Sequence, residues 1–301
     1  MREEYKNQIW LHFAVLIFGT TGILGKLISL GANHLVWYRL VVAVIALGLF
    51  LLLVQHRFRS RGHSVRKMLA VGIILAAHWV TFFEAIKQSN VSVSLVCFSS
   101  STLFVSFIEP LYYKRKVAWH EPLLGVFIVV GLYFVFRAEF TYLLGMQLSI
   151  LSAFLAAWFT VLNGLLVREN DARTITFFEL LGALGVLTLF MLLTDELKVR
   201  ELGLPLADLG WLLILGVVCT AFSFVLSVQL VKKISPYSFV MAVNLEPIYA
   251  IILALLIWPE SETMSEGFYL GAGIVVLTIF LNAYIQKKRR LFATGSVDSG
   301  G

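Results

Sequence analysis

Residues 236–257 read PYSFVMAVNLEPIYAIILALLI, an apolar run of 22 residues with a carboxylate and a proline near its middle. This length suits a helix that crosses a bilayer. A charged side chain at the bilayer centre costs about 2.5–3.5 kcal/mol on insertion scales. Pro247 also leaves the carbonyl of Val243 without its helical hydrogen bond. Glu246 and Pro247 therefore mark a functional position within a membrane-spanning helix.

The rest of the chain has the same apolar character. Hydrophobic residues make up 59% of the 301 residues, charged residues make up 14%, and the mean hydropathy is +0.87. These values exclude a water-soluble globular protein. The two cysteines both lie within apolar runs and indicate neither a disulfide framework nor a metal site. Apolar runs of about 17–25 residues predict ten membrane-spanning helices, at 8–25, 35–54, 67–87, 91–112, 120–136, 143–166, 174–194, 208–231, 236–258 and 267–286.

Basic residues are distributed unevenly around these runs. Of the 24 lysines and arginines, 18 lie on the side that ten spans assign to both termini. The positive-inside rule therefore predicts cytoplasmic termini. The first run follows Arg2 and Lys6 without a small-residue cleavage site, so we interpret it as a retained helix. The net charge of +6 reflects this topology and predicts no nucleic-acid partner, because the bases are spread over short loops.

The chain also carries an internal repeat. A shift of 146 positions aligns 87–134 with 233–280 and gives nine identities, clustered at loop starts and on one helix. Chance matching of apolar residues is the alternative explanation. Each half contains five spans, so the second half enters the membrane inverted, and basic 114–116 falls on acidic 260–262. The sequence predicts two inverted five-helix repeats, at 8–137 and 143–286.

The repeat brings two polar positions together. Under the same shift Glu246 and Pro247 fall on Ser100 and Ser101, about nine or ten residues into their helices. This depth is roughly 14 Å in a hydrocarbon core of ~30 Å. Transporters built from inverted repeats bind substrate near the midplane, often at interrupted helices. We therefore expect both positions to line one central cavity.

Three segments resemble a known family. They are FFEAIKQS at 82–89, WYR at 37–39 and NLEPIYA at 244–250. They are similar to the drug/metabolite transporter superfamily of EamA type, over about residues 8–290. The resemblance implies ten helices in two inverted halves around a central cavity. It also implies a transporter of the bacterial inner membrane, since members export amino acids and other metabolites.

Two positions depart from the pattern of this family. Many members have a proline at the equivalent point of the fourth helix, where this chain has Ser101, and a Leu-Gly-Glu turn after it. Lys114 stands where the second half has Glu260. A gate that depends on a broken helix over 91–112 is therefore in doubt.

Several residues are candidates for substrate binding. Glu246 either binds a substrate amine or a proton, or it holds a kinked helix against a neighbour. Tyr249, three residues further on, shares its helix face and either orients a ligand or packs. His78 is either a proton carrier or a histidine satisfied by a neighbouring helix, and aromatic residues inside spans either line the cavity or fill the core. The substrate-binding candidates are Glu246, Tyr249, Ser100, Ser101, His78, Trp79, Phe82 and Trp158.

Charged residues near the span edges are candidates for gates. Arg39 and Glu179 occupy equivalent places in the two inverted halves, so they lie in opposite leaflets. We expect Arg39 to pair with Glu84 as an outer latch. We expect Glu179 to pair with Lys233 as an inner latch, unless these are structural ion pairs that never open. Pro247, which interrupts its helix, is the fifth gating candidate.

The sequence therefore predicts a small-solute carrier that works by alternating access and exports amino acids or related metabolites. It predicts no catalytic residue, metal or cofactor. One alternative is proton-coupled efflux of cationic drugs. Two others come from different classes: an intramembrane enzyme, for which His-Glu-x-x-His and Gly-x-Ser-x-Gly motifs are missing, and a membrane scaffold, for which the loops are too short.

Two further features concern assembly and the membrane surface. Gly267, Gly271 and Gly125 predict close helix packing, either within the chain or across a dimer, so both a monomer and a homodimer remain open. Residues 287–301 predict a basic, disordered cytoplasmic tail. Its lysines and arginines at 287–290 either attract anionic lipid headgroups or only stop the last span from slipping in the membrane.

Overall fold

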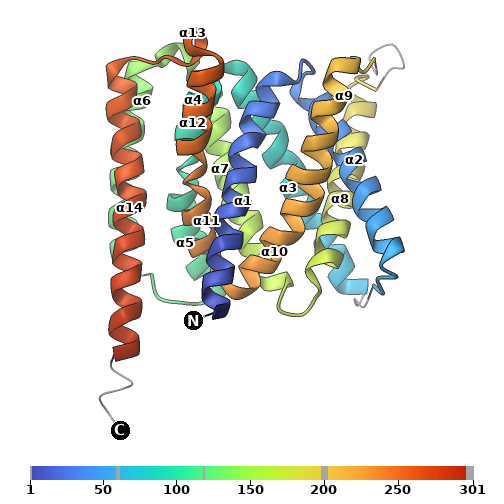
Figure 1. Cartoon of the computed structure of the whole chain (residues 1–301), viewed down its shortest axis with the longest axis horizontal. Helices are drawn as coiled ribbons and strands as arrows, with labels where there is room; N and C mark the ends of the chain where they lie inside the picture. The colour runs from blue at the N-terminus through green and yellow to red at the C-terminus, as the bar shows by residue number, and fades with distance from the viewer. Residues whose placement is uncertain (1, 59–61, 118, 198–202, 296–301) are drawn as a thin grey trace.

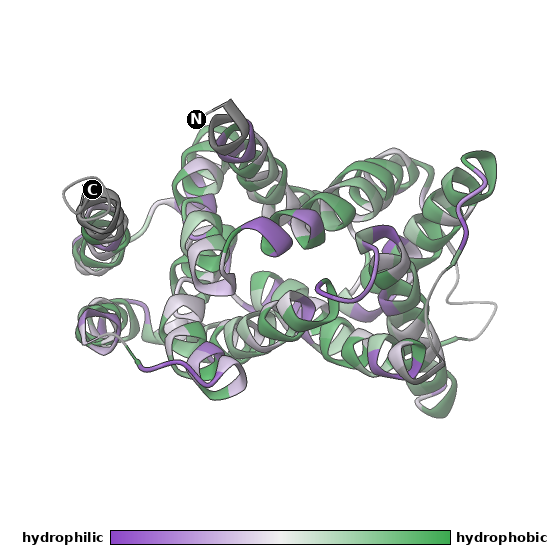
Figure 2. Cartoon of the chain, turned by 90° about the horizontal axis from the view of Figure 1, so that it is seen from below, coloured by the Kyte–Doolittle hydropathy of each residue, from purple (hydrophilic) through white to green (hydrophobic). Residues whose placement is uncertain are grey.

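The computed structural model describes residues 2–58, 62–117, 119–197 and 203–295, and these form a bundle of long helices. Nine helical spans in this part of the chain are long and apolar enough to cross a membrane, and Glu266–Asn282 adds a shorter apolar helix. The prediction of an all-helical membrane protein with ten spans is thus confirmed. Hydrophobic residues dominate the helix surfaces, and hydrophilic ones gather at the helix ends (Figure 2).

The first repeat contains α1 (Arg2–Leu27), α2 (Ala32–Leu53), α3 (Gly62–Gln88), α4 (Val91–Phe98), α5 (Ser101–Tyr113) and α6 (His120–Ala138). After the short helix η1 (Phe140–Tyr142), the second repeat contains α7 (Leu143–Leu166), α8 (Ala172–Leu193), α9 (Leu206–Leu213), η2 (Ile214–Phe222), α10 (Ser223–Lys233), α11 (Pro236–Val243), α12 (Glu246–Ile257), α13 (Pro259–Glu262) and α14 (Glu266–Gly295). In each repeat the fourth span is divided into two helices, α4 with α5 and α11 with α12.

The start of α1 and the end of α14 lie on one face of the bundle, which we call the terminal face, and α13 lies on the opposite face (Figure 1). The two repeats pack reciprocally. Helix α1 contacts α10 and α12 of the second repeat, whereas α7 contacts α3, α4 and α5 of the first. Helices α4 and α5 run from the opposite face to the terminal face, and α11 and α12 run the other way. The predicted inverted repeat is confirmed by this arrangement.

The first divided helix corrects the expectation drawn from Ser101. Helix α4 ends at Phe98 and α5 begins at Ser101 without a proline at the break. The hydroxyl of Ser99 donates to the carbonyl of Leu95 at 3.2 Å, and such serine contacts compete with regular helical hydrogen bonds. A run of serines therefore interrupts α4–α5, as Asn244 and Leu245 interrupt α11–α12.

The structure also shifts the repeat register by one residue. The N-caps of α4 and α11 are Asn90 and Ser235, whose side chains accept from backbone N–H groups in the first turn. These N-caps lie 145 positions apart, and so do the first residues of α5 and α12, Ser101 and Glu246. Glu246 therefore corresponds to Ser101, whereas the shift of 146 had aligned it with Ser100.

The last helices of the two repeats, α6 and α14, form a pair at one end of the bundle (Figure 2). They approach closely because Gly131 and Gly271 face one another. A Cβ atom built on Gly271 would lie 2.5 Å from the carbonyl oxygen of Gly131. Gly125 and Gly267 also pack within the chain, against Leu103 and Ala138.

Part of the basic tail belongs to the last helix. Helix α14 continues to Gly295, whereas disorder is expected from residue 287 onward. The remainder of the predicted tail, 296–301, lies outside the described residues.

The glycine contact between α6 and α14 gives a first prediction. Replacing Gly271 by alanine should destabilise the protein by about 1–3 kcal/mol, because the added methyl group meets backbone atoms that cannot move aside. The melting temperature in detergent should fall by several degrees. The matched control is Gly273→Ala in the same helix, where nothing lies within 4 Å of the added carbon. Equal melting temperatures for the two variants would contradict the close approach.

Candidate functional site

The two helix breaks cross in the middle of the bundle and are joined by one side chain. The amide nitrogen of Asn244 donates to the carbonyl of Ser99 at 3.1 Å and to the hydroxyl of Thr102. Its amide oxygen accepts from the hydroxyl of Ser101 at 3.0 Å. Asn244 is only 1% exposed. The break of the second repeat is thus hydrogen-bonded to polar groups at the break of the first.

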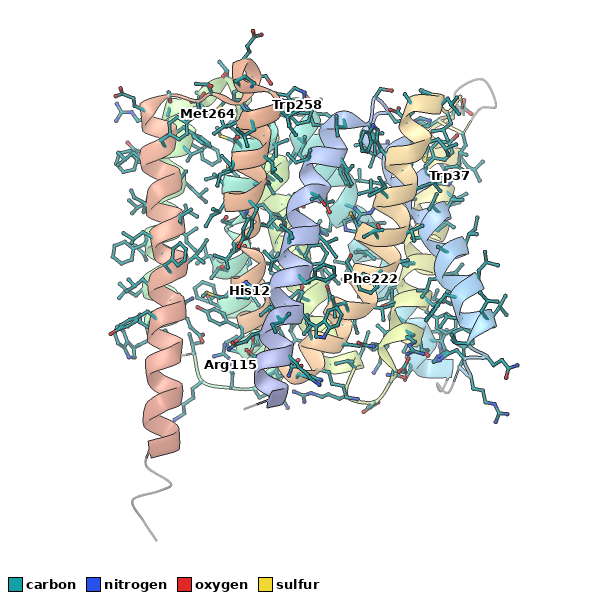
Figure 3. The ribbon with its side chains drawn as sticks, viewed as in Figure 1. His12, Trp37, Arg115, Phe222, Trp258 and Met264 are labelled. Atoms are coloured by element: carbon teal, nitrogen blue, oxygen red, sulfur yellow. The ribbon has the colours of Figure 1, made fainter. Side chains whose placement is uncertain are left out.

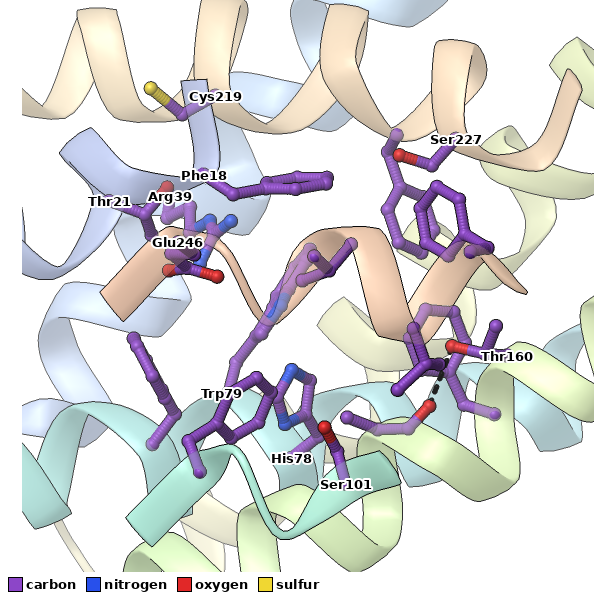
Figure 4. Close-up of a pocket in the computed structure, with 18 residues that line it drawn as sticks. Phe18, Thr21, Arg39, His78, Trp79, Ser101, Thr160, Cys219, Ser227 and Glu246 are labelled. Carbon is purple, nitrogen blue, oxygen red and sulfur yellow. Dashed lines mark hydrogen bonds between the residues drawn. The ribbon is translucent and has the colours of Figure 1, made fainter. Parts of the chain in front are cut away.

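A cavity of about 100 Å³ lies beside this crossing. Its walls come from both repeats, namely α1, α2, α3, α4, α5, α7, η2, α10, α11 and α12. A water molecule needs about 10–15 Å³ measured in this way, so the cavity has room for a small solute. Figure 4 shows the polar side chains that reach it, including Arg39, His78, Ser101 and Glu246.

Two opposite charges face this cavity. Glu246 stands in the first turn of α12 and is 5% exposed, where the helix dipole favours a negative charge. Arg39 of α2 is 2% exposed. Figure 4 shows its guanidinium near the Glu246 carboxylate, and the two charges interact electrostatically. Among the described residues they form no direct salt bridge.

The guanidinium of Arg39 is held by other contacts. Its Nε donates to the hydroxyl of Thr220 at 2.6 Å, and its Cζ lies 3.8 Å from the ring centroid of Trp79. Its Nη1 is buried without a hydrogen-bond partner among the described residues. A buried donor without a partner is costly. Arg39 is therefore fixed in position and retains one donor for a ligand.

Thr220 belongs to η2, a π-helical segment. Its hydroxyl donates to the carbonyl of Leu215, five residues earlier, at 2.6 Å. A Cβ atom on Gly216 would lie 2.5 Å from Val42, so this segment lies directly against α2. π-helical insertions occur frequently at functional sites. Sequence analysis missed this segment because its residues are as apolar as those of a regular span.

Aromatic rings form the remaining wall. The ring of His78 stacks on Phe98 at 5.7 Å and on Phe159 at 6.2 Å, and Phe159 stacks on Phe224 at 5.5 Å. The Nδ1 atom of His78 lies 2.8 Å from the hydroxyl of Ser152. His78 therefore lines the cavity and is also hydrogen-bonded to α7. Its role as a proton carrier stays a prediction.

The structure brings together five of the eight residues proposed to bind substrate. Ser101, His78, Trp79, Phe82 and Glu246 all line the cavity. Their binding roles remain predictions.

The other three residues do not line this cavity. Ser100 is buried beside the break, and its hydroxyl has no partner among the described residues. Tyr249 is 40% exposed on the outside of α12. Trp158 donates its indole N–H to Tyr112 at 2.9 Å, and the next residue, Phe159, faces the cavity in its place.

Neither proposed gating pair is formed. Arg39 is held by Thr220 and Trp79, whereas Glu84 accepts from Gln88 at 2.7 Å. Lys233 donates to Asn7 at 3.1 Å. Glu179 is fully buried and accepts from Asn163 at 3.2 Å. The two residues of each proposed pair were expected to meet because they lie in the same leaflet. Their side chains instead point to different neighbours. Pro247 is buried in the first turn of α12, immediately after the break.

Two other carboxylates join the repeats. Glu262, 0% exposed, accepts from the N–H groups of Val91 and Ser92 at 3.2 and 2.9 Å, at the start of α4, and pairs with Lys26 at 2.7 Å. Lys26 also covers the ring of Trp258, which lies at the opposite face (Figure 3).

Glu109 makes the corresponding contact at the terminal face. It accepts from the N–H of Tyr237 in the first turn of α11 at 2.6 Å and pairs with Arg115 at 3.1 Å (Figure 3). Each repeat thus places a carboxylate on the N-terminus of a half-helix in the other repeat, where the helix dipole favours it. We call Glu109 and Glu262 the cross-caps. Sequence analysis missed both, since the loops that meet cannot be read from spacing.

Comparison with known proteins agrees with this architecture. A solved structure titled "Crystal structure of protein" has a TM-score of 0.68 over 93% of this chain and 96% of its own, with 12% sequence identity. This likeness concerns the fold alone. No curated protein sequence matches the chain.

The family model of the EamA-like transporter family matches residues 6–137 and 143–284, which together make up most of the chain. The structure and this match agree on a multi-pass membrane protein. The chain belongs to the EamA-like transporter family of the drug/metabolite transporter superfamily, whose members are non-enzymatic transporters of small solutes.

Proposed function

We propose that this transporter exports amino acids or closely related zwitterionic metabolites across a bacterial inner membrane by alternating access. The observation that carries the proposal is the presence of Arg39 and Glu246 in one cavity without a direct salt bridge between them. A substrate with an ammonium and a carboxylate group complements both charges. The carboxylate accepts from Nη1 of Arg39, the buried donor without a partner, and the ammonium group faces Glu246.

The size and walls of the cavity narrow the class of substrate. Pockets for drug-sized ligands measure about 300–1,000 Å³, whereas this one measures about 100 Å³. An arginine in the cavity also opposes a ligand that carries only positive charge. Both observations favour an amino acid over a cationic drug. The rings of Trp79, Phe82 and Phe98 suit an apolar or aromatic side chain.

The cross-caps supply two places at which the repeats separate. Glu109 closes the terminal face and Glu262 closes the opposite face. Alternating access then requires one cross-cap to open while the other stays closed, as the repeats rock about the Asn244 contact. By the positive-inside rule the terminal face is cytoplasmic, so export loads the solute from that face.

The proposed roles of Glu246 and Arg39 predict that each variant loses discrimination for a different group of the substrate, the ammonium for Glu246 and the carboxylate for Arg39. In proteoliposomes, Glu246→Gln should weaken competition by an amino acid relative to its des-amino analogue by about 10- to 100-fold, since a charge-assisted hydrogen bond is lost. Arg39→Gln should weaken competition by the amino acid relative to its decarboxylated amine by a similar factor. Competition against uptake of a labelled apolar amino acid measures both.

The exposed residues Glu266 and Arg137 provide the matched controls Glu266→Gln and Arg137→Gln, which should leave both ratios unchanged. A screen of metabolite efflux from cells with and without the protein identifies the labelled solute to use. If the amino acid, its des-amino analogue and its decarboxylated amine compete equally in the wild type, the two charges do not recognise a zwitterion.

The cross-caps predict which face of the cavity opens. Cys219 lines the cavity, whereas Cys97 lies in a separate core cluster and can be replaced by alanine. In that background Glu262→Gln should increase labelling of Cys219 from the opposite face several-fold, and Glu109→Gln should increase it from the terminal face. A membrane-impermeant thiol reagent added to one side of oriented vesicles measures this.

Glu260→Gln, at an exposed acid in the same short helix as Glu262, controls for loss of charge alone. The gating role fails if either cross-cap variant increases labelling equally from both sides, or if neither differs from Glu260→Gln.

A further inference from the structure

One more buried carboxylate, that of Glu179, lies outside the cavity and has no role in the proposed function. Glu179 of α8 is 0% exposed, and no charged side chain in the described part of the chain forms a salt bridge with it. An ionised carboxylate that is buried without a cation or a full set of donors is strongly disfavoured. The surroundings of Glu179 therefore decide its charge.

The hydrogen bonds around Glu179 leave two oxygen atoms without donors. Asn163 of α7 donates from Nδ2 to Oε2 of Glu179 at 3.2 Å. The other oxygen of each side chain, Oδ1 of Asn163 and Oε1 of Glu179, is buried without a partner among the described residues. An amide oxygen and a carboxylate oxygen are both acceptors, so they cannot bond to each other directly. One proton on Glu179 satisfies both oxygens.

We propose that Glu179 and Asn163 form a proton-binding site. The carboxyl group is protonated in this conformation, its Oε1–H donates to Oδ1 of Asn163, and the Asn163 amide donates to Oε2. This paired arrangement of a carboxylic acid and an amide completes the hydrogen bonds of both side chains. Because α7 and α8 carry one member each, separating these helices exposes the carboxyl group and releases the proton to water.

The position of the pair suits coupling to transport. Asn163 lies one helical turn from Thr160, which lines the cavity. On the other side, Thr176 precedes Glu179 by one turn of α8, and its buried hydroxyl also lacks a partner among the described residues. Coupling rests on the proposed export function: a proton taken up at the opposite face and released at the terminal face would travel against the exported solute.

No neighbouring ionisable group forms a salt bridge that would neutralise an ionised Glu179 within the described residues. The elements packed on α8 are α2, α3 and α10, and at the level of Glu179 the facing residue of α3 is Gly72. His78 of α3 is hydrogen-bonded to Ser152, and His56 after α2 lies 2.9 Å from the hydroxyl of Thr174. The other acidic and basic side chains described on these elements, on α8 and in the loop between α7 and α8 are His34, Arg39, Arg66, Lys67, Glu84, Lys87, Arg168, Glu169, Asp171, Arg173, Lys232 and Lys233. None of them forms a salt bridge with Glu179 within the described residues.

Infrared spectroscopy of the full chain in lipid nanodiscs tests the site independently of transport. At neutral pH the wild type should show the carbonyl stretch of a protonated carboxylic acid, and this band should be lost in Glu179→Gln. Glutamine is the matched substitution, because its amide reproduces both hydrogen bonds to Asn163. The band should remain in Glu84→Gln, at a partly exposed acid, and should move to higher frequency in Asn163→Leu. A wild type without the band has an ionised Glu179, which overturns the proposal.

A transport assay tests the coupling. In proteoliposomes, Glu179→Gln should retain solute exchange and lose the accumulation that a pH gradient drives. Unchanged pH-driven accumulation in this variant, or accumulation driven by a sodium gradient instead, overturns coupling through Glu179. If the wild type moves no solute while the infrared band is present, the export function fails and the proton site stands.

Discussion

The hydrogen bonds of Asn244 across the two broken helices hold the centre of this structure together. Lipid offers no donors or acceptors to a broken helix, so backbone groups freed at the bilayer centre must be satisfied by protein. Asn244 satisfies the carbonyl of Ser99 and the hydroxyls of Ser101 and Thr102 from within the other repeat. Because the breaks are joined in this way, the first turn of α12 is directed toward the centre and Glu246 reaches the cavity.

The same constraint accounts for the ends of the broken helices. The starts of α4 and α11 are buried, and their free N–H groups require acceptors. Glu262 and Glu109 supply these acceptors from the opposite repeat, and each is neutralised by a base, Lys26 or Arg115. The contacts that cap α4 and α11 are therefore also the contacts that join the two repeats at both faces. Separating the repeats at a face removes the acceptor from the helix that starts there.

Much of the fold could be predicted from the sequence, because length, hydropathy and an odd number of spans per half determine the membrane topology. The site was less accessible. Glu246 and Pro247 identified one break, since a charge and a proline are both costly there, but the break at Ser99 and Ser100 depends on side-chain hydrogen bonds that several serines can make or leave unmade. Tyr249 was placed on the face of Glu246 by helical spacing, yet Glu246 lines the cavity while Tyr249 is exposed on the outside of α12. The pairing of Arg39 with Glu84 failed for a similar reason: depth in the membrane fixes the layer of a side chain and not its direction.

The reciprocal packing of the repeats has an evolutionary consequence. Helix α1 meets α10 and α12 as α7 meets α3 and α4, Glu109 and Glu262 exchange roles, and Gly131 meets Gly271. Such an interface is isologous, with a two-fold axis in the plane of the membrane. A single ancestral five-helix polypeptide inserted in both orientations would therefore recognise its own inverted copy through these contacts. Fusion of two such genes would free the two halves to diverge, so that one half could have an acid, Glu246, where the other has the hydroxyl of Ser101.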